Sequence, residues 1–216
     1  MAGLSFLRWI DGNGWLVFAG GATKEGDVRA RALARLDAGG AVAYISLAND
    51  GGDALLDDME DLGAPTGFIL DVLHEPSGVV EEQLKSVAMV VIEGATSIDS
   101  LYRALSESVI EAIRAAYERG ALILLEGLAI NLFGTWLMSD DGVIYEGLGW
   151  VHEAFLEPNV TSAQDSRAVQ DVLMSQPKAI AIAIGESSAL ALGGDGTLEV
   201  WGDKQVTISL GGYYQN

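Results

Sequence analysis

Residues 121–129 read Ala-Leu-Ile-Leu-Leu-Glu-Gly-Leu-Ala, and this stretch decides the fold. Residues 121–125 form a continuous apolar run, which is typical of a strand buried on both faces of a parallel sheet. Gly127 and the small Ala129 then provide a tight turn, and the residues after them favour a helix that reaches Met138. A buried strand that runs through a tight turn into a helix is the repeating unit of an α/β protein.

The same alternation of apolar runs and amphipathic segments fills the first two thirds of the chain. The other predicted strands are residues 15–19, 41–47, 66–73 and 88–92. The other predicted helices are residues 23–36, 53–62, 79–87 and 97–119, the last with Gly120 as its C-cap. Continuous apolar strands between helices predict a parallel sheet that is covered on both faces and connected by right-handed crossovers.

Short apolar runs separated by glycine-rich turns mark the last third of the chain. These runs are residues 179–184, 189–192, 198–201 and 206–210. Such a pattern predicts antiparallel hairpins at the edge of the sheet. The expected fold class is therefore α/β, a doubly wound and mostly parallel sheet with helices on both faces and an antiparallel C-terminal hairpin extension. We expect a single domain over residues 1–216.

The composition excludes several kinds of site. The 216 residues include no cysteine, which excludes disulfides, thiolate metal ligands and a cysteine nucleophile, and the two histidines, His74 and His152, lack metal-ligand spacing. Acidic residues outnumber basic ones by 31 to 12, and the net charge of -19 argues against nucleic acid as a partner. No glycine motif matches a P-loop or a dinucleotide fingerprint, so we expect neither a metal nor a cofactor.

The sequence also bears on where the protein acts. Residues 1–9 lack the basic start, the long apolar core and the small-residue cleavage site of a signal peptide. No run of about 18 apolar residues without charge is present, which predicts no membrane span. We therefore expect a cytoplasmic protein whose acidity serves solubility or, alternatively, attracts a cationic ligand or partner.

Several segments follow one another in an order and spacing that resemble a known family. They are Ile92-Glu93-Gly94-Ala95-Thr96-Ser97, Glu126-Gly127-Leu128-Ala129-Ile130-Asn131, Gly147-Leu148-Gly149, Glu157-Pro158-Asn159-Val160, Ile184-Gly185-Glu186-Ser187-Ser188-Ala189-Leu190 and Gly194-Asp195-Gly196. Over residues 15–208 the chain resembles the cyanophycinase and peptidase E family, serine hydrolases with a class I glutamine-amidotransferase-like fold. In that family the second segment is a Gly-Thr-Ser-Ala-Gly-Ala nucleophile elbow.

The framework glycines of this family are present, but its catalytic residues are not. By the resemblance, Leu128 stands at the serine position and Asn159 at the histidine position, while Glu186 keeps an acidic character. Leucine has no nucleophilic atom, and loss of a triad member removes several orders of magnitude of rate. The resemblance therefore implies a non-catalytic relative that binds a small molecule, a peptide or a protein partner, and a homodimer, since relatives of this fold often associate.

The candidate binding cleft lies at the C-terminal ends of the strands, where doubly wound sheets carry their functional groups. Its expected residues are Gly20, Gly21, Glu93, Gly94, Ala95, Thr96, Ser97, Glu126, Gly127, Leu128, Ala129 and Asn159. If Leu128 keeps the unusual backbone angles of an elbow, it carries about 1–3 kcal/mol of strain. Its side chain either caps a former pocket or fills it.

Two alternatives remain open from the residues alone. Glu93 and Glu126 either face one cleft, where they could bind a cation or act as acid and base, or are solvated loop carboxylates. The alternative function is a hydrolase with a substitute nucleophile at the same cleft. Its candidate hydroxyls are Thr96, Ser97 and Thr135, and its candidate bases are Glu93, Glu126 and His152. Thr96 or Ser97 could equally serve as the N-cap of the following helix.

Overall fold

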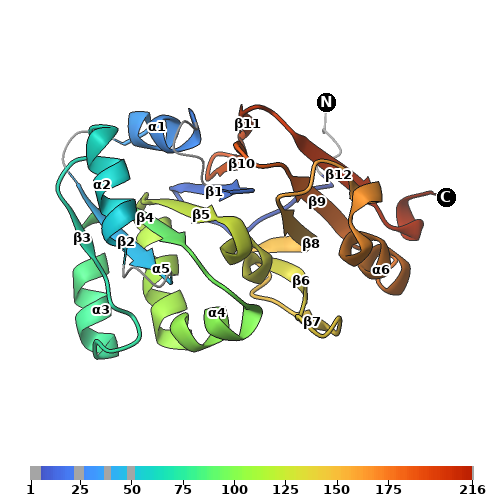
Figure 1. Ribbon diagram of the computed structural model, residues 1–216, viewed down its shortest axis with the longest axis horizontal. Helices are drawn as coiled ribbons and strands as arrows, with labels where there is room; N and C mark the ends of the chain where they lie inside the picture. The colour runs from blue at the N-terminus through green and yellow to red at the C-terminus, as the bar shows by residue number, and fades with distance from the viewer. Residues whose placement is uncertain (1–5, 22–26, 37–39, 48–51, 216) are drawn as a thin grey trace.

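The computed structural model describes residues 6–21, 27–36, 40–47 and 52–215 (Figure 1). Its larger sheet has seven strands in the order β11-β10-β1-β5-β4-β2-β3. These strands are β1 (Trp15–Ala19), β2 (Ala41–Ser46), β3 (Gly67–Ile69), β4 (Val87–Glu93), β5 (Leu122–Glu126), β10 (Ser188–Gly193) and β11 (Leu198–Gly202). Strands β1 to β5 pair in parallel, whereas β10 and β11 pair antiparallel at one edge. The α/β fold class with an antiparallel C-terminal hairpin is confirmed.

Helices cover both faces of this sheet because its strands are apolar on both sides (Figure 1). They are α1 (Asp27–Ala34), α2 (Asp53–Asp61), α3 (Ser77–Leu84), α4 (Ile98–Ala104) and α5 (Glu107–Arg119). Along β5, Ile123 and Leu125 join the core under α3, α4 and α5, whereas Leu122 and Leu124 join the core under α1 and α2. This alternation follows from the two-residue period of a strand.

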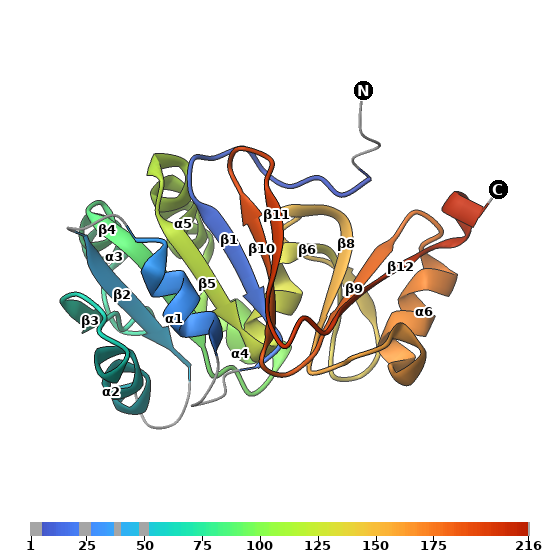
Figure 2. The ribbon, with the colours of Figure 1, turned by 90° about the horizontal axis from the view of Figure 1, so that it is seen from above.

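A second sheet of five strands lies beside the first and carries helix α6 (Arg167–Ser175) (Figure 2). Its order is β12-β9-β8-β6-β7. These strands are β6 (Gly134–Met138), β7 (Ile144–Glu146), β8 (Val151–Pro158), β9 (Ile180–Ile184) and β12 (Val206–Leu210). The runs at 179–184 and 206–210 therefore pair with one another here, and not at the edge of the first sheet.

Two of the predicted helices were wrong. The helix expected to reach Met138 is a 3-10 helix, η1 (Gly127–Phe133), followed by strand β6. Gly134 is extended, and a Cβ at this position would lie 2.5 Å from the Ala154 carbonyl oxygen, so the chain here pairs closely with β8 instead of coiling. The helix expected at 97–119 is broken between α4 and α5, because Leu105 leaves the helical region and Ser106 starts the next helix.

Other elements match the sequence predictions more closely. Gly120 caps α5 in the left-handed conformation with φ of 117°, as predicted. Helix α1 begins at Asp27, and the first residues of the helix predicted at 23–36 lie outside the described part of the chain. In the described ranges, no helix has both the length and the apolar character needed to cross a bilayer.

Candidate functional site

In the turn after β5 the left-handed backbone angles fall on glycine and not on Leu128. Gly127 follows β5 directly and has φ of 59°, whereas Leu128 is not among the residues with positive φ. A side chain in this left-handed region costs about 1–2 kcal/mol, a penalty that glycine avoids. Leu128 therefore does not have the unusual backbone angles of an elbow, so the strain expected under that condition is absent. The left-handed residue of the turn, Gly127, has no side chain that could attack a substrate.

Leu128 lies next to this position and is half-buried against the main hydrophobic core. Ala129 and Ile130 follow it and are fully buried. An apolar side chain in this place contributes packing, and it offers no atom for acid–base or nucleophilic chemistry.

The loops named from the sequence come together at the C-terminal edge of the first sheet. Ala19 is in register with Glu126, so Gly20 and Gly127 leave neighbouring strands side by side. The Gly20 amide donates to the Ser188 carbonyl oxygen at 3.0 Å, which fastens the end of β1 to β10. A Cβ on Gly20 would lie 2.3 Å from the carbonyl oxygen of Gly185, so only glycine allows this approach.

Gly21, Asn159 and Glu186 meet at this edge. A Cβ placed on Gly21 would lie 2.7 Å from Asn159 Oδ1 and 3.6 Å from Glu186 Cγ. Asn159 is exposed and has φ of 58°, a left-handed conformation that asparagine tolerates better than most residues. By the resemblance, Asn159 stands at the position of the catalytic histidine and Glu186 lies in the acidic segment. These two positions lie together in the structure, and Asn159 offers an amide where the family has an imidazole.

Arg29 on α1 donates hydrogen bonds to both Glu93 and Glu126. Arg29 was not among the site residues expected from the sequence. Its Nε lies 2.9 Å from Glu126 Oε1 and its Nη2 lies 2.7 Å from Glu126 Oε2, a bidentate pair. The same guanidinium lies 3.4 Å from Glu93 Oε2 and 3.2 Å from Asp58 Oδ2. Ser46 Oγ donates to Glu93 Oε1 at 3.2 Å. We call Arg29, Glu93, Glu126 and Asp58 the arginine cluster.

Burial makes the arginine cluster a tightly held group. Arg29 is 5% exposed and Glu126 is 3% exposed, so the interpretation of Glu126 as a solvated carboxylate is wrong. Burial by itself would lower the pKa of Arg29, but the bond to Glu126 and the charges of Glu126, Glu93 and Asp58 raise it above its usual value. Glu93 and Glu126 do lie together, as the first of the two alternatives had it, and Arg29 already engages both.

Two of the three candidate hydroxyl groups have structural partners. Ser97 is the N-cap of α4, where its Oγ accepts from the Ser100 amide at 3.1 Å and the Ser100 hydroxyl accepts from the Ser97 amide at 3.2 Å. Thr135 Oγ1 donates to the Val151 carbonyl oxygen at 3.2 Å and accepts from the Glu153 amide at 2.9 Å. Thr96, which precedes the cap, is exposed.

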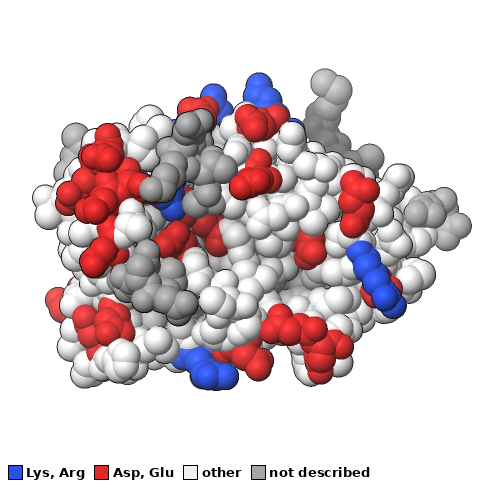
Figure 3. Space-filling view, viewed as in Figure 1, with Lys and Arg blue, Asp and Glu red and all other residues white. Residues whose placement is uncertain are grey.

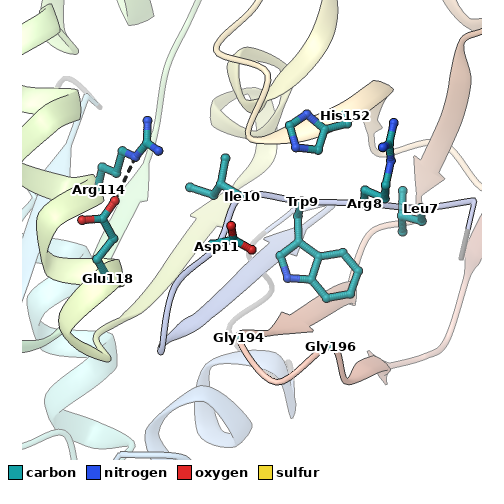
Figure 4. Close-up of a pocket in the computed structure, with 10 residues that line it drawn as sticks. All are labelled: Leu7, Arg8, Trp9, Ile10, Asp11, Arg114, Glu118, His152, Gly194 and Gly196. Carbon is teal, nitrogen blue, oxygen red and sulfur yellow. Dashed lines mark hydrogen bonds and ion pairs between the residues drawn. The ribbon is translucent and has the colours of Figure 1, made fainter.

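His152 lies in a different part of the molecule (Figure 4). It lines a cavity of about 580 Å³ with the segment from Leu7 to Asp11, Arg114 and Glu118 of α5, Gly194 and Gly196. Asp11 precedes β1 and Glu118 precedes β5, so this cavity opens at the N-terminal ends of the strands. The candidate cleft lies at their C-terminal ends, and His152 is therefore separated from Thr96 and Ser97.

Glu157, at the end of β8, is a half-buried carboxyl group two residues before Asn159. It accepts from Ser166 Oγ at 3.2 Å and lies 3.5 Å from Nδ2 of Asn131, which also donates to the Leu156 carbonyl oxygen at 2.6 Å. Burial raises the pKa of Glu157, and the bonds from Ser166 and Asn131 offset this only in part. The only sequence signal for this group was its place two residues before Asn159.

No set of side chains suited to a metal ion is found where the structure describes the chain. Three or more His, Asp or Glu side chains do not gather with metal-binding geometry within the described ranges. In the arginine cluster the carboxylates face a guanidinium, which takes the place that a cation would need.

Comparison with known proteins identifies the fold. No protein-family model and no curated protein sequence matches this chain. Among solved structures, a peptidase from an acI-B1 Actinobacterium has a TM-score of 0.71 and 15% identity, over 93% of this chain and 95% of that one. A candidate peptidase E protein from Listeria monocytogenes EGD-e has a TM-score of 0.61 and 15% identity, over 88% of this chain and 98% of that one. The chain thus has a peptidase E-like α/β fold, and at this identity the likeness extends to the fold alone.

Proposed function

We propose that this chain is a non-catalytic relative of the cyanophycinase and peptidase E family that binds a small molecule or a peptide. The binding cleft is formed by the loops after β1, β4, β5 and β8. The observation that carries the proposal is the turn after β5, where the left-handed position is Gly127 and the next side chain is Leu128. Neither residue has an atom that could form a covalent intermediate.

The polar groups that line this edge suit binding. Asn159 offers an amide with two donors and an acceptor, and the exposed carboxylate of Glu186 lies beside it. Glu93, half-buried in the arginine cluster, adds another carboxylate at the end of β4. A ligand with an amino group would find acceptors here, while the resident Arg29 is already paired with carboxylates.

The alternative, a hydrolase with a substitute nucleophile, has weaker support. A nucleophilic hydroxyl needs a base within hydrogen-bond reach. Ser97 and Thr135 are each engaged by backbone groups, and His152 lies at the other end of the strands. Glu93 and Glu126 already accept hydrogen bonds from Arg29.

A substitution that narrows the cleft tests the proposal. In Gly21→Ala the new Cβ must displace the Asn159 amide, because it would lie 2.7 Å from Oδ1. We expect at least one member of a panel of dipeptides to bind the wild-type protein in saturation-transfer NMR, to bind Gly21→Ala more weakly, and to remain intact during the measurement. Gly78→Ala is the matched control, since a Cβ on Gly78 meets nothing within 4 Å. Cleavage of a dipeptide, or equal binding by Gly21→Ala and wild type, would contradict the proposal.

A further inference from the structure

A groove between helix α4 and the β6–β7 hairpin has aromatic walls. It encloses about 650 Å³ and is lined by Ile98, Asp99 and Tyr102 of α4 and by Ser139, Asp140, Asp141, Tyr145 and Glu146 of the hairpin. Tyr102 is 45% exposed and Tyr145 is 49% exposed, although both are large rings. Val143, at the tip of the hairpin, is also exposed.

The rim of this groove is acidic. Its carboxylates are Asp99, Asp140, Asp141 and Glu146, and none of the described lining residues is Lys or Arg. Arg103 follows Tyr102 on α4, but it does not line the groove. In Figure 3 acidic side chains gather on the surface around this hairpin. Carboxylates around aromatic faces attract a cation by charge and by its interaction with the ring.

Hydrogen bonds connect the two walls of the groove and close the hairpin turn. Tyr102 Oη donates to the Glu146 carbonyl oxygen at 3.2 Å, which joins α4 to the hairpin. Ser139 closes the hairpin turn, since its amide donates to the Val143 carbonyl oxygen at 2.9 Å and its hydroxyl bonds to Asp141. A preformed surface loses less conformational entropy on binding than one that must first be ordered.

We propose that this groove docks a basic peptide segment of a partner protein. The charged head of a Lys or Arg side chain would lie among the rim carboxylates, and its apolar stem would pack on Tyr102 and Tyr145. Pockets for small molecules bury most of their ligand, whereas protein interfaces use exposed tyrosines of this kind. The groove contains no residue of the candidate cleft, so this proposal stands independently of the proposed function.

The experiment uses a fluorescein-labelled peptide of alternating Lys and Gly residues and measures its fluorescence anisotropy with the full chain. A peptide of alternating Glu and Gly serves as the probe of opposite charge. Tyr145→Ala should weaken binding of the Lys peptide by about three- to fivefold, and Tyr145→Phe should keep most of it, because phenylalanine retains the ring face on which the stem packs. Asp99→Asn with Asp141→Asn should weaken it by about fivefold.

A matched pair of substitutions distinguishes the effect of the groove carboxylates on binding from the effect of the protein's overall negative charge. Asp57→Asn with Asp61→Asn removes two negative charges, as the groove variant does, but from exposed positions of α2. It should change the affinity for the Lys peptide less than twofold, because salt screens charges that lie far from the groove. Equal weakening by the two double variants, or no binding of the Lys peptide to wild type, would overturn the proposal. So would spermidine alone binding at the groove as tightly as the peptide, because the occupant would then be a small polyamine.

Discussion

Arg29 is the residue that organises the candidate site, and it is a buried cation in a chain of net charge -19. On α1 it shares the buried side with Val28 and Ala32. A helical pattern places charged residues on the solvent face by default, so periodicity alone gave no reason to bury this one. Its partners come from β4, β5 and α2, which only the folded chain brings together.

Removal of the Arg29 charge should destabilise the protein strongly. Arg29→Met leaves Glu126 buried without its cation, and breaking a buried pair in this way costs about 3–5 kcal/mol. Urea denaturation followed by circular dichroism gives the free energy of unfolding. Adding Glu126→Gln to Arg29→Met should recover part of the loss, because it removes the uncompensated charge.

Arg31→Met on the same helix is the control. Arg31 pairs with Asp27 at 2.9 Å, but both side chains are well exposed, so this loss should be about 0.5 kcal/mol or less. Similar losses for Arg29→Met and Arg31→Met would show that the arginine cluster does not contribute as described.

Glu157 gives a prediction for pH dependence. Burial raises its pKa above the ordinary value of 4.5, so the folded state holds this proton more tightly than the unfolded state. The resulting stabilisation is complete below the ordinary pKa and is lost as the pH rises through the raised folded-state pKa. Glu157→Gln stays neutral at every pH. Its free energy of unfolding should therefore rise relative to wild type as the pH increases above the ordinary pKa of 4.5.

The difference between the two proteins isolates Glu157 from other titrating groups. Glu81→Gln, on an exposed position of α3, controls for the loss of one formal charge. A difference between wild type and Glu157→Gln that stays constant with pH, or that falls as pH rises, would show that burial does not raise the pKa of this carboxyl group.

At the scale of elements, the turn between β5 and η1 depends on glycine. Gly127→Ala places a side chain at φ of 59°, which should cost about 1–2 kcal/mol even though a Cβ there would meet nothing within 4 Å. Gly78→Ala in α3 also adds a methyl group to open space, but at an ordinary helical φ, and should stabilise by about 0.5–1 kcal/mol. Thermal unfolding of both variants measures the contrast, and equal shifts of Tm would argue against a required left-handed turn.

The sequence predicted the elements of the first sheet better than those of the second. Each parallel strand of the first sheet is a continuous apolar run between helices, and its period and length are distinctive. Strand β6 follows η1 directly, and its residues Gly134–Met138 are apolar enough to suit a helix equally well. Its extended conformation is set by pairing with β8 across the second sheet, a contact that no local pattern encodes.

At the scale of the molecule, topology accounts for what could be predicted about the site. Parallel strands bring the ends of β1, β4 and β5 to one edge, so loops named separately in the sequence became neighbours. Asn159 and Glu186 joined them through the pairing of β8 with β9. Among the aromatic residues of 136–155, Trp150 and Phe155 are buried in the core and Tyr145 is exposed at the groove.

The proposed function requires that the turn after β5 in this peptidase E-like fold carries no working nucleophile. The most direct test is labelling of the purified protein with a fluorophosphonate probe, followed by peptide mapping of any adduct, beside an active serine hydrolase as positive control. We predict no adduct on this chain, because Gly127 and Leu128 occupy the turn and the nearby Ser97 hydroxyl caps α4. A stoichiometric adduct on Thr96, Ser97 or Thr135 would contradict the claim and would identify a substitute nucleophile.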